Sequence, residues 1–172
     1  MRSRLLPLLA LAVGSLSSAA AQSTLVFNPP AGAPPKNKHV VLLSGDEEYR
    51  SEEALPMLAK ILSQRHGFKT TVLFALDPDG TINPENQKSL AGADALDNAD
   101  LIIMSLRFRN WADDQMKRFV DACLRGVPLI ALRTSTHAFN FPAESQWAKF
   151  TWNSKEPWPG GFGKRVLGET WI

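Results

Sequence analysis

The chain has a single cysteine, Cys123, among its 172 residues. One cysteine cannot close an intrachain disulfide, so the fold has to be stabilised by its hydrophobic core. Cys123 follows Met116, Phe119 and Val120 at the i, i+3, i+4, i+7 spacing of a helical apolar stripe. A reactive free thiol is the functional alternative, but the stripe predicts a small core residue.

Several chemical signatures are also absent. The segment SGDEEYR after the first predicted strand has one glycine and three acids, unlike a Gly-rich loop that holds a pyrophosphate. No cysteine and histidine spacing matches a structural zinc site, and the hydrolase pattern G-x-S-x-G does not occur. We therefore expect no nucleotide cofactor and no structural zinc site, and the sequence names no cofactor and no metal-binding residues.

A long apolar run occurs at the N-terminus. Arg2 and Arg4 precede an apolar stretch over residues 5–16, which is too short to cross a bilayer, and Ala19 to Ala21 form a small-residue cleavage site. This pattern predicts a signal peptide over residues 1–21, with a retained anchor as the alternative. The mature protein is then expected in the periplasm or outside the cell.

Charge is balanced once the leader is set aside. The leader carries two of the 19 basic residues and none of the 17 acidic ones, so the remaining chain has 17 of each. A neutral chain has no general attraction to nucleic acid or to an anionic membrane, and we expect neither as a partner. With 44% hydrophobic residues the chain can build a core, which argues against disorder.

Apolar runs alternate with helical patterns along the rest of the chain. Residues 22–38 are rich in proline and predict a linker, and residues 39–172 predict one domain. Strands are expected at 40–43, 70–76, 101–104 and 129–132, with helices beginning near Glu53, after Asn83-Pro84 and at Trp111. This order predicts an α/β fold with a doubly wound, mostly parallel sheet and helices on both faces.

The end of the chain departs from this alternation. Four of the five tryptophans lie in the last 26 residues, and the final segment VLGETWI resembles the beginning of a strand. Either this tail supplies a fifth strand or the chain stops early. The tryptophans are expected to cover the core, or to stack on sugar rings.

Acidic residues follow the first predicted strand. Asp46, Glu47 and Glu48 stand beside Tyr49 and Arg50. Clustered carboxylates can raise one another's pKa and supply a general acid, chelate a hard cation, or hydrogen-bond sugar hydroxyls. The alternative is a solvated acidic loop before a helix.

Two arginines follow the third predicted strand, in the segment SLRFRNW. Arg107 and Arg109 could clamp an anion or a carboxylate. Alternatively, they form salt bridges to the acidic loop across the edge of the sheet, and the two possibilities are compatible.

Polar residues also follow the fourth predicted strand, namely Arg133, Thr134, Ser135, Thr136 and His137. His137 is a candidate acid, base or metal ligand. The alternative is that the histidine and the three hydroxyls cap local backbone. Since ligands of open α/β sheets bind at the carboxyl ends of strands, we expect these residues at the lip of a crevice.

Four segments together, GDEEYRSEEALPMLAKIL, DLIIMSLRFRNW, GVPLIALRTSTHAF and PWPGGFGKRVLGETWI, resemble secreted bacterial members of the trehalose-utilisation (ThuA-like) family. That family lies within the class I glutamine-amidotransferase-like superfamily, which has a flavodoxin-like fold. The resemblance covers residues 39–172 and implies a role related to carbohydrate.

The sequence departs from the superfamily at two places. Arg133 stands where its glutaminases carry a nucleophilic cysteine, and arginine cannot attack a carbonyl, so Cys-dependent amidase chemistry is not expected. Similar proteins also continue beyond GETW, whereas this chain stops at Ile172. We therefore expect a shortened, and in the extreme case inactive, member of the family.

These observations predict a protein that binds or acts on a sugar or keto-sugar in a polar crevice. Glu47 or Glu48 and His137 are the expected proton carriers if the protein is an enzyme. The expected binding residues are Asp46, Tyr49, Arg50, Arg107, Arg133, Thr134, Ser135 and Thr136. The alternative is a non-catalytic binding domain that keeps the fold without the chemistry.

Overall fold

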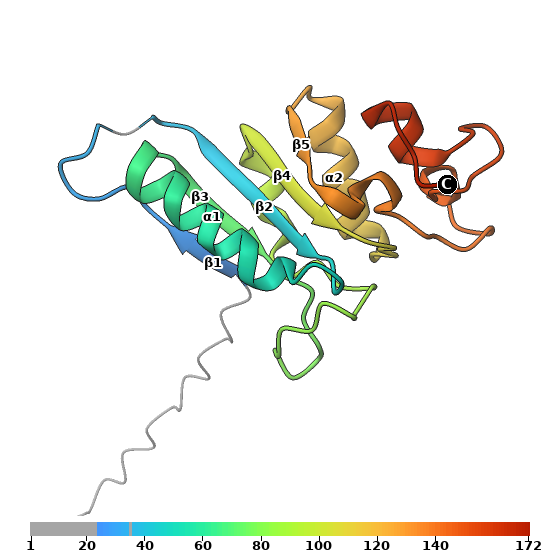
Figure 1. Ribbon diagram of the computed structural model, residues 1–172, viewed down its shortest axis with the longest axis horizontal. Coiled ribbons are helices and arrows are strands. Elements are labelled where there is room, and N and C mark those ends of the chain that lie inside the picture. Colours follow the sequence, from blue (N-terminus) through green and yellow to red (C-terminus); the bar gives the residue numbers. More distant parts are fainter. Residues whose placement is uncertain (1–23, 35) are drawn as a thin grey trace, which may run out of the picture.

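The computed structural model describes residues 24–34 and 36–172, so the expected signal peptide lies outside the described residues. The protein has an α/β fold built on one five-stranded sheet in the order β1-β3-β2-β4-β5 (Figure 1). The strands are β1 (Thr24–Phe27), β2 (His39–Gly45), β3 (Lys69–Leu73), β4 (Leu101–Leu106) and β5 (Leu129–Ala131). The helices are α1 (Ser51–His66) and α2 (Asp113–Leu124), with short turns of helix η1 (Ala93–Asn98), η2 (Arg133–His137), η3 (Ala148–Phe150) and η4 (Gly163–Leu167).

Four strands of the sheet are parallel. β2 lies at the centre and pairs with β3 on one side and β4 on the other, and β4 pairs in turn with β5. In register, Val41 of β2 stands opposite Ile102 of β4, and Leu43 stands opposite Met104. The four parallel strands therefore run in one direction and end at one edge of the sheet.

Each face of the sheet buries its own apolar cluster. Val41 and Leu43 point to the face covered by α2, where they join Phe119. Val40 and Leu42 point to the opposite face, where they join Leu55 of α1 and other apolar residues. Because successive strand residues alternate between faces, this all-apolar strand is buried on both sides, and α1 and α2 cover opposite faces (Figure 1).

The N-terminal segment contains a strand that the sequence analysis did not predict. Residues 22–38 were expected to form a linker, but Thr24–Phe27 pair antiparallel with β3 as an edge strand. The four-residue run TLVF carries β-forming residues, and the prolines that follow it concealed the signal. The fifth strand of the sheet therefore comes from residues 24–27, which precede the predicted domain boundary, and not from the tail.

The helix expected after Asn83-Pro84 does not form. Asn83 Nδ2 donates to Asp77 Oδ2 at 2.9 Å, and Asn86 Nδ2 donates to the Leu76 carbonyl at 2.8 Å. Asparagine side chains that bond locally in this way stabilise turns in competition with a helix. The connection between β3 and β4 is therefore a looped segment with the short helix η1 in it.

The tail forms no strand within the described residues. Phe162 is buried in the core cluster, and the following η4 ends at Gly168, which has a left-handed φ of 84°. A Cβ on Gly163 would lie 2.0 Å from the Thr136 carbonyl oxygen, so only glycine permits this close packing of the tail on η2. The tail thus packs as coil and helical turn at the end of the sheet.

The single cysteine is a packed residue of α2. Cys123 lies half-buried against the core cluster that includes Met116 and Phe119. Burial raises the pKa of its thiol to about 11, which leaves little of the reactive thiolate at neutral pH. No helix among the described residues is both long enough and apolar enough to span a membrane.

Candidate functional site

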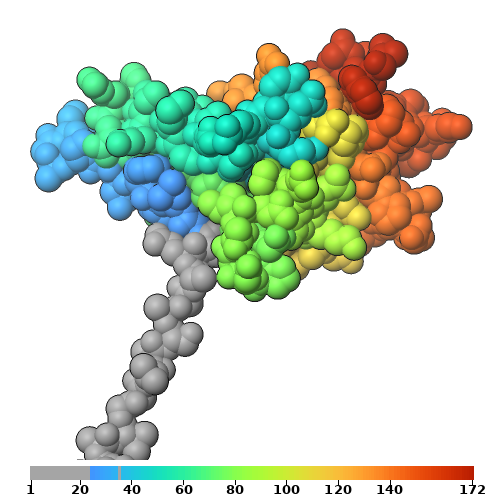
Figure 2. All heavy atoms as spheres, turned by 60° about the horizontal axis from the view of Figure 1, so that its bottom comes forward, coloured from blue at the N-terminus to red at the C-terminus, as the bar shows by residue number. Residues whose placement is uncertain are grey.

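The residues predicted to carry chemistry gather at the edge where the parallel strands end. The loop after β2 continues to α1, residues 107–110 follow β4, and η2 follows β5. Figure 2 shows the loop after β2 (cyan), the segment after β4 (yellow) and the C-terminal segment (red) beside one another on the surface. The chain leaves β2 toward β3 on one side and later returns to β4 on the other, a reversal at which open α/β sheets bind ligands.

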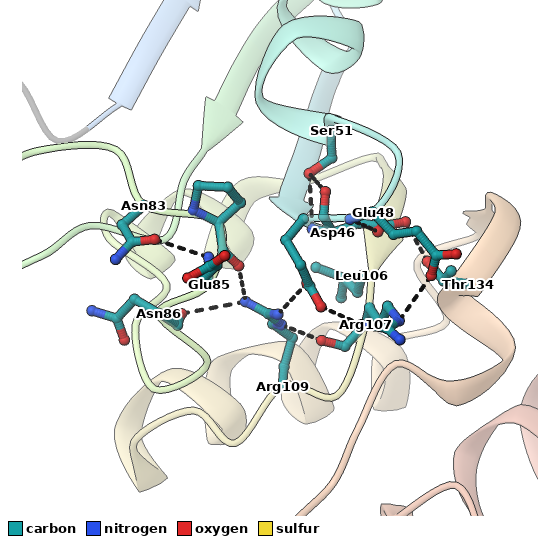
Figure 3. A network of polar contacts seen from close by, with 12 residues as sticks. Asp46, Glu48, Ser51, Asn83, Glu85, Asn86, Leu106, Arg107, Arg109 and Thr134 are labelled. Carbon is teal, nitrogen blue, oxygen red and sulfur yellow. Dashed lines mark hydrogen bonds and ion pairs between the residues drawn. The ribbon is translucent and has the colours of Figure 1, made fainter.

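Asp46 lies beneath the loop after β2 and forms hydrogen bonds to groups at all three strand ends. Its side chain is fully buried, and one carboxylate oxygen accepts hydrogen bonds from the backbone amides of Glu48 (3.0 Å) and Tyr49 (3.3 Å). The other oxygen accepts from the hydroxyls of Thr134 and Ser105. Asp46 therefore shapes the loop after β2 and joins it to the ends of β4 and β5, as Figure 3 shows in part.

Glu47 binds both arginines that follow β4. Its two carboxylate oxygens pair with Arg107 and, at 3.1 Å, with Arg109. Arg107 Nε also lies 3.2 Å from a Glu48 oxygen without forming a hydrogen bond. The expectation that these arginines form salt bridges to the acidic loop is confirmed, so each of them already has a carboxylate partner.

Arg109 is the largest fully buried side chain of the protein among the described residues. Besides Glu47, its guanidinium donates to the carbonyls of Arg107 (2.6 Å), Pro84 (2.8 Å) and Asn86 (3.3 Å). Burial lowers the pKa of Arg109 to about 10, although Glu47 opposes the shift, so the side chain stays charged at neutral pH. It joins the β3–β4 loop to the strand edge (Figure 3).

An open pocket of about 480 Å³ lies above this layer of ion pairs. The residues that line it come from the loop after β2, from the end of β4, from η2 and from the tail: Glu48, Tyr49, Arg107, Arg133, Thr134, Thr136, His137 and Trp171. Charged, hydroxyl and aromatic groups therefore face one space. Seven of the eight lining residues are predicted site residues.

The other predicted site residues lie outside the pocket. Asp46 and Glu47 are held in the layer of hydrogen bonds and ion pairs described above. Ser135 is fully buried, where its hydroxyl bonds the Met104 carbonyl and the Leu106 amide. Arg50 is exposed and pairs with Glu53 on the surface. These four residues shape the site or its surroundings and do not face the pocket.

Backbone strain concentrates around the same edge. Three of the four non-glycine residues with positive φ in the described chain are Arg50 (49°), Phe108 (54°) and Arg133 (51°). Phe108 and Arg133 stand just beyond the ends of β4 and β5, and Arg50 directly precedes α1. Left-handed geometry is unfavourable for residues with a Cβ and recurs at binding sites, where the surrounding structure holds it in place.

His137 is enclosed by aromatic rings at the pocket wall. The centroid of its ring lies 5.0 Å from that of Phe108 and 4.9 Å from that of Trp171. Burial and the charge of Arg107 lower the pKa of His137, while nearby carboxylates, with Asp46 first among them, oppose the shift. The imidazole is therefore neutral at pH 7, and it can accept a proton or a hydrogen bond.

This lowered pKa makes stability depend on pH in a defined direction. Below the ordinary histidine value of 6.5, the unfolded chain takes up a proton that folded His137 resists. The free energy of unfolding should therefore fall as the pH drops from 6.5 toward the lower folded-state pKa. Urea unfolding at pH about 7.5 and about 5.5 should show a smaller loss for His137→Gln than for the wild type.

His39 and the carboxylates are present in both the wild type and the His137→Gln variant. Their contributions to the pH dependence of stability therefore cancel when the two are compared. His39 also has a pKa lowered by burial, so it contributes in the same direction to both. An equal loss of stability in the two proteins would show that His137 is protonated as easily in the folded state as in the unfolded chain.

Trp171 is a pocket residue that the sequence analysis did not include among the site residues. Trp171 is 48% exposed, and its ring contacts the rings of Trp152 and Phe108. The signal was the cluster of tryptophans in the tail, but sequence alone did not separate Trp171 from Trp147 and Trp158, which pack against the core cluster.

Among the described residues, no three histidine, cysteine, aspartate or glutamate side chains gather where they could hold a metal ion. The acids after β2 are held by hydrogen-bond donors and guanidinium groups instead. Comparisons with protein-family models, with curated proteins and with solved structures found no match to this chain.

Proposed function

We propose that the protein is an exported, ThuA-like domain that binds or acts on a sugar or keto-sugar in the pocket at the carboxyl ends of its strands. In this proposal the fold is doubly wound and flavodoxin-like. The parallel strands in the order β3-β2-β4-β5, with α1 and α2 on opposite faces, support it.

The observation that carries the proposal is the composition of the pocket. The carboxylate of Glu48 and the hydroxyl of Thr136 can exchange hydrogen bonds with a polyhydroxyl ligand, while the Thr134 hydroxyl already donates to Asp46. The half-exposed ring of Trp171 offers an apolar face for a sugar ring. The volume of about 480 Å³ lies within the range of about 300–1,000 Å³ found for small-molecule sites.

Acid/base chemistry is the catalytic form of this proposal. His137 is neutral at pH 7 and Glu48 lines the same pocket, so these two residues are its proton carriers. Glu47 is withdrawn from this role, because both of its oxygens bind arginine. A non-catalytic binding domain is the second candidate, and the commitment of Asp46 and Glu47 to structural contacts favours it.

A binding and turnover experiment tests the function. We expect at least one member of a panel of glycosides and keto-glycosides to bind saturably, and Glu48→Gln and His137→Ala each to weaken binding several-fold. Because both residues line one pocket, the double variant should deviate from additivity by about 0.5–3 kcal/mol. Exposed Glu144 and His66 provide matched controls, and Glu144→Gln and His66→Ala should leave affinity unchanged.

The outcomes separate the two candidates. Turnover of a bound saccharide that is lost in Glu48→Gln or His137→Ala supports the enzyme, whereas binding without turnover supports the binding domain. Strictly additive losses in the folded double variant would mean separate sites, and no binding anywhere in the panel would refute the carbohydrate proposal.

A further inference from the structure

One cation that faces the pocket has no acidic partner. Within the described chain, Arg133 forms no ion pair, whereas Arg107 is bound by Glu47 and lies beside Glu48. The buried carboxylate of Asp46 accepts its hydrogen bonds from amides and hydroxyls, and within the described residues it forms no ion pair with Arg133. The charge of Arg133 is therefore available to a ligand.

The guanidinium of Arg133 is also held in position. Its central carbon lies 4.0 Å from the centroid of the Tyr49 ring, which is a cation–π contact. Stacking of this kind occupies one face of the planar group and leaves the N–H groups along its edge free to donate. The residue starts η2 with a left-handed φ of 51°, an unfavourable conformation that directs the chain around the pocket.

Because Arg133 is the cation of the pocket without an acidic partner in the described chain, the pocket suits a ligand with a single negative charge. A guanidinium edge matches a carboxylate with two parallel hydrogen bonds and a single opposite charge. A phosphate monoester carries up to two negative charges at neutral pH and would leave one uncompensated beside Arg133. The hydroxyl of Thr136 and the carboxylate of Glu48 lie around the same space and suit the hydroxyl groups of a sugar.

Resting on the function proposed above, we propose that the natural ligand is a sugar acid whose carboxylate is bound by the stacked Arg133 guanidinium. The carboxylate replaces water at the free N–H edge, and the sugar ring extends toward Trp171 and His137. Arg133 is then the residue that discriminates acidic from neutral sugars.

Titration calorimetry with matched pairs tests this inference: glucose, galactose and mannose against glucuronate, galacturonate and mannuronate. We expect at least one uronate to bind about 10- to 100-fold more tightly than its neutral counterpart, which is the contribution of a charge-assisted pair. Arg133→Gln should abolish this preference while changing affinity for the neutral sugar less than about threefold. Arg133→Lys should retain part of the preference for the uronate, because an ammonium group keeps the positive charge but cannot form the two parallel hydrogen bonds of a guanidinium.

Arg50→Gln is the matched control, since Arg50 is exposed, belongs to the same loop as Glu48 and pairs with Glu53 outside the pocket. It should leave the preference for the uronate unchanged. Arg133 is exposed, so its variants should unfold at the wild-type temperature, and circular dichroism checks this.

Each remaining outcome is decisive. Equal affinity for uronates and neutral sugars would refute the sugar-acid assignment and leave the proposed function intact. Tighter binding of glucose 6-phosphate than of glucuronate would refute the carboxylate in favour of a phosphate. Failure of every sugar, neutral or acidic, to bind would refute both the inference and the function on which it rests.

Discussion

Replacing Arg109 with methionine is expected to lower the free energy of unfolding by about 3 kcal/mol, toward the lower end of the cost of breaking a buried ion pair. Methionine fills part of the space but donates no hydrogen bond. The carbonyls of Arg107, Pro84 and Asn86 lose their donor, and Glu47 loses one of its two cations. The cost stays near the lower end because Glu47 keeps Arg107.

Arg118→Met is the matched control, measured in the same urea titrations. Arg118 and its partner Asp97 are both exposed on the surface, and such pairs contribute about 0–1 kcal/mol. Arg109→Lys should fall between wild type and Arg109→Met, because lysine keeps the charge but cannot reach the three carbonyls at once. Equal, small losses for Arg109→Met and Arg118→Met would show that the buried network contributes no net stability.

Removal of the Asp46 carboxylate is expected to cost about 2–3 kcal/mol, the value of hydrogen bonds to a charged group with a buried donor left unpaired. Asp46→Ala leaves the buried hydroxyl of Thr134 without its acceptor and frees the amides of Glu48 and Tyr49. Because the loop after β2 then loses its attachment to η2, ligand affinity should fall together with stability.

Asp46→Asn and Asp121→Ala give this prediction its controls. Asparagine keeps the shape and one acceptor oxygen, so it should cost less than alanine. Asp121 belongs to an exposed i, i+4 pair with Lys117, worth about 0.2–0.5 kcal/mol. If Asp46→Ala were as mild as Asp121→Ala, or left the affinity for saccharide intact, Asp46 would not be what positions the loop.

The two substitutions act on a layer that separates the pocket from the core. The polar atoms of Asp46, Glu47 and Arg109 form hydrogen bonds and ion pairs with backbone groups and with side chains of neighbouring loops. They are therefore unavailable to a ligand. Glu48, Arg133 and His137 stand above them and face the pocket. Substitutions in this layer should therefore lower stability, and at Asp46 the ligand affinity as well, whereas substitutions of Glu48 or Arg133 should change recognition with little loss of stability.

The strand pattern was predictable from the sequence because it depends on local composition. The buried parallel strands are short all-apolar runs, and β2, β4 and β5 lie where such runs predicted them. The edge strand Thr24–Phe27 was missed, because the prolines beside it indicated a linker. The helix expected after Asn83 was wrong, because side-chain hydrogen bonds of asparagine stabilise a turn there instead.

The sequence also determined that its polar strand ends would share one edge. Parallel strands joined by crossovers end on the same side of a sheet, so GDEEYR, RFRN and RTSTH had to lie at one edge wherever such a sheet formed, and the strand order β2-β4-β5 then makes them neighbours. This is why seven of the eight pocket residues could be named in advance. The composition of each strand end, with its acids, guanidinium groups and hydroxyls, set the chemistry available there.

Only the tertiary structure decided which of these side chains face a ligand. The sequence around the three adjacent acids does not distinguish their roles. In the structure, Asp46 points under the loop, Glu47 toward the arginines and Glu48 to the pocket. Likewise, Arg109 is buried and paired while Arg133 is stacked and free. These differences follow from backbone directions and from partners far apart in sequence, because a buried charge takes whichever opposite charge or carbonyl the folded chain brings within reach.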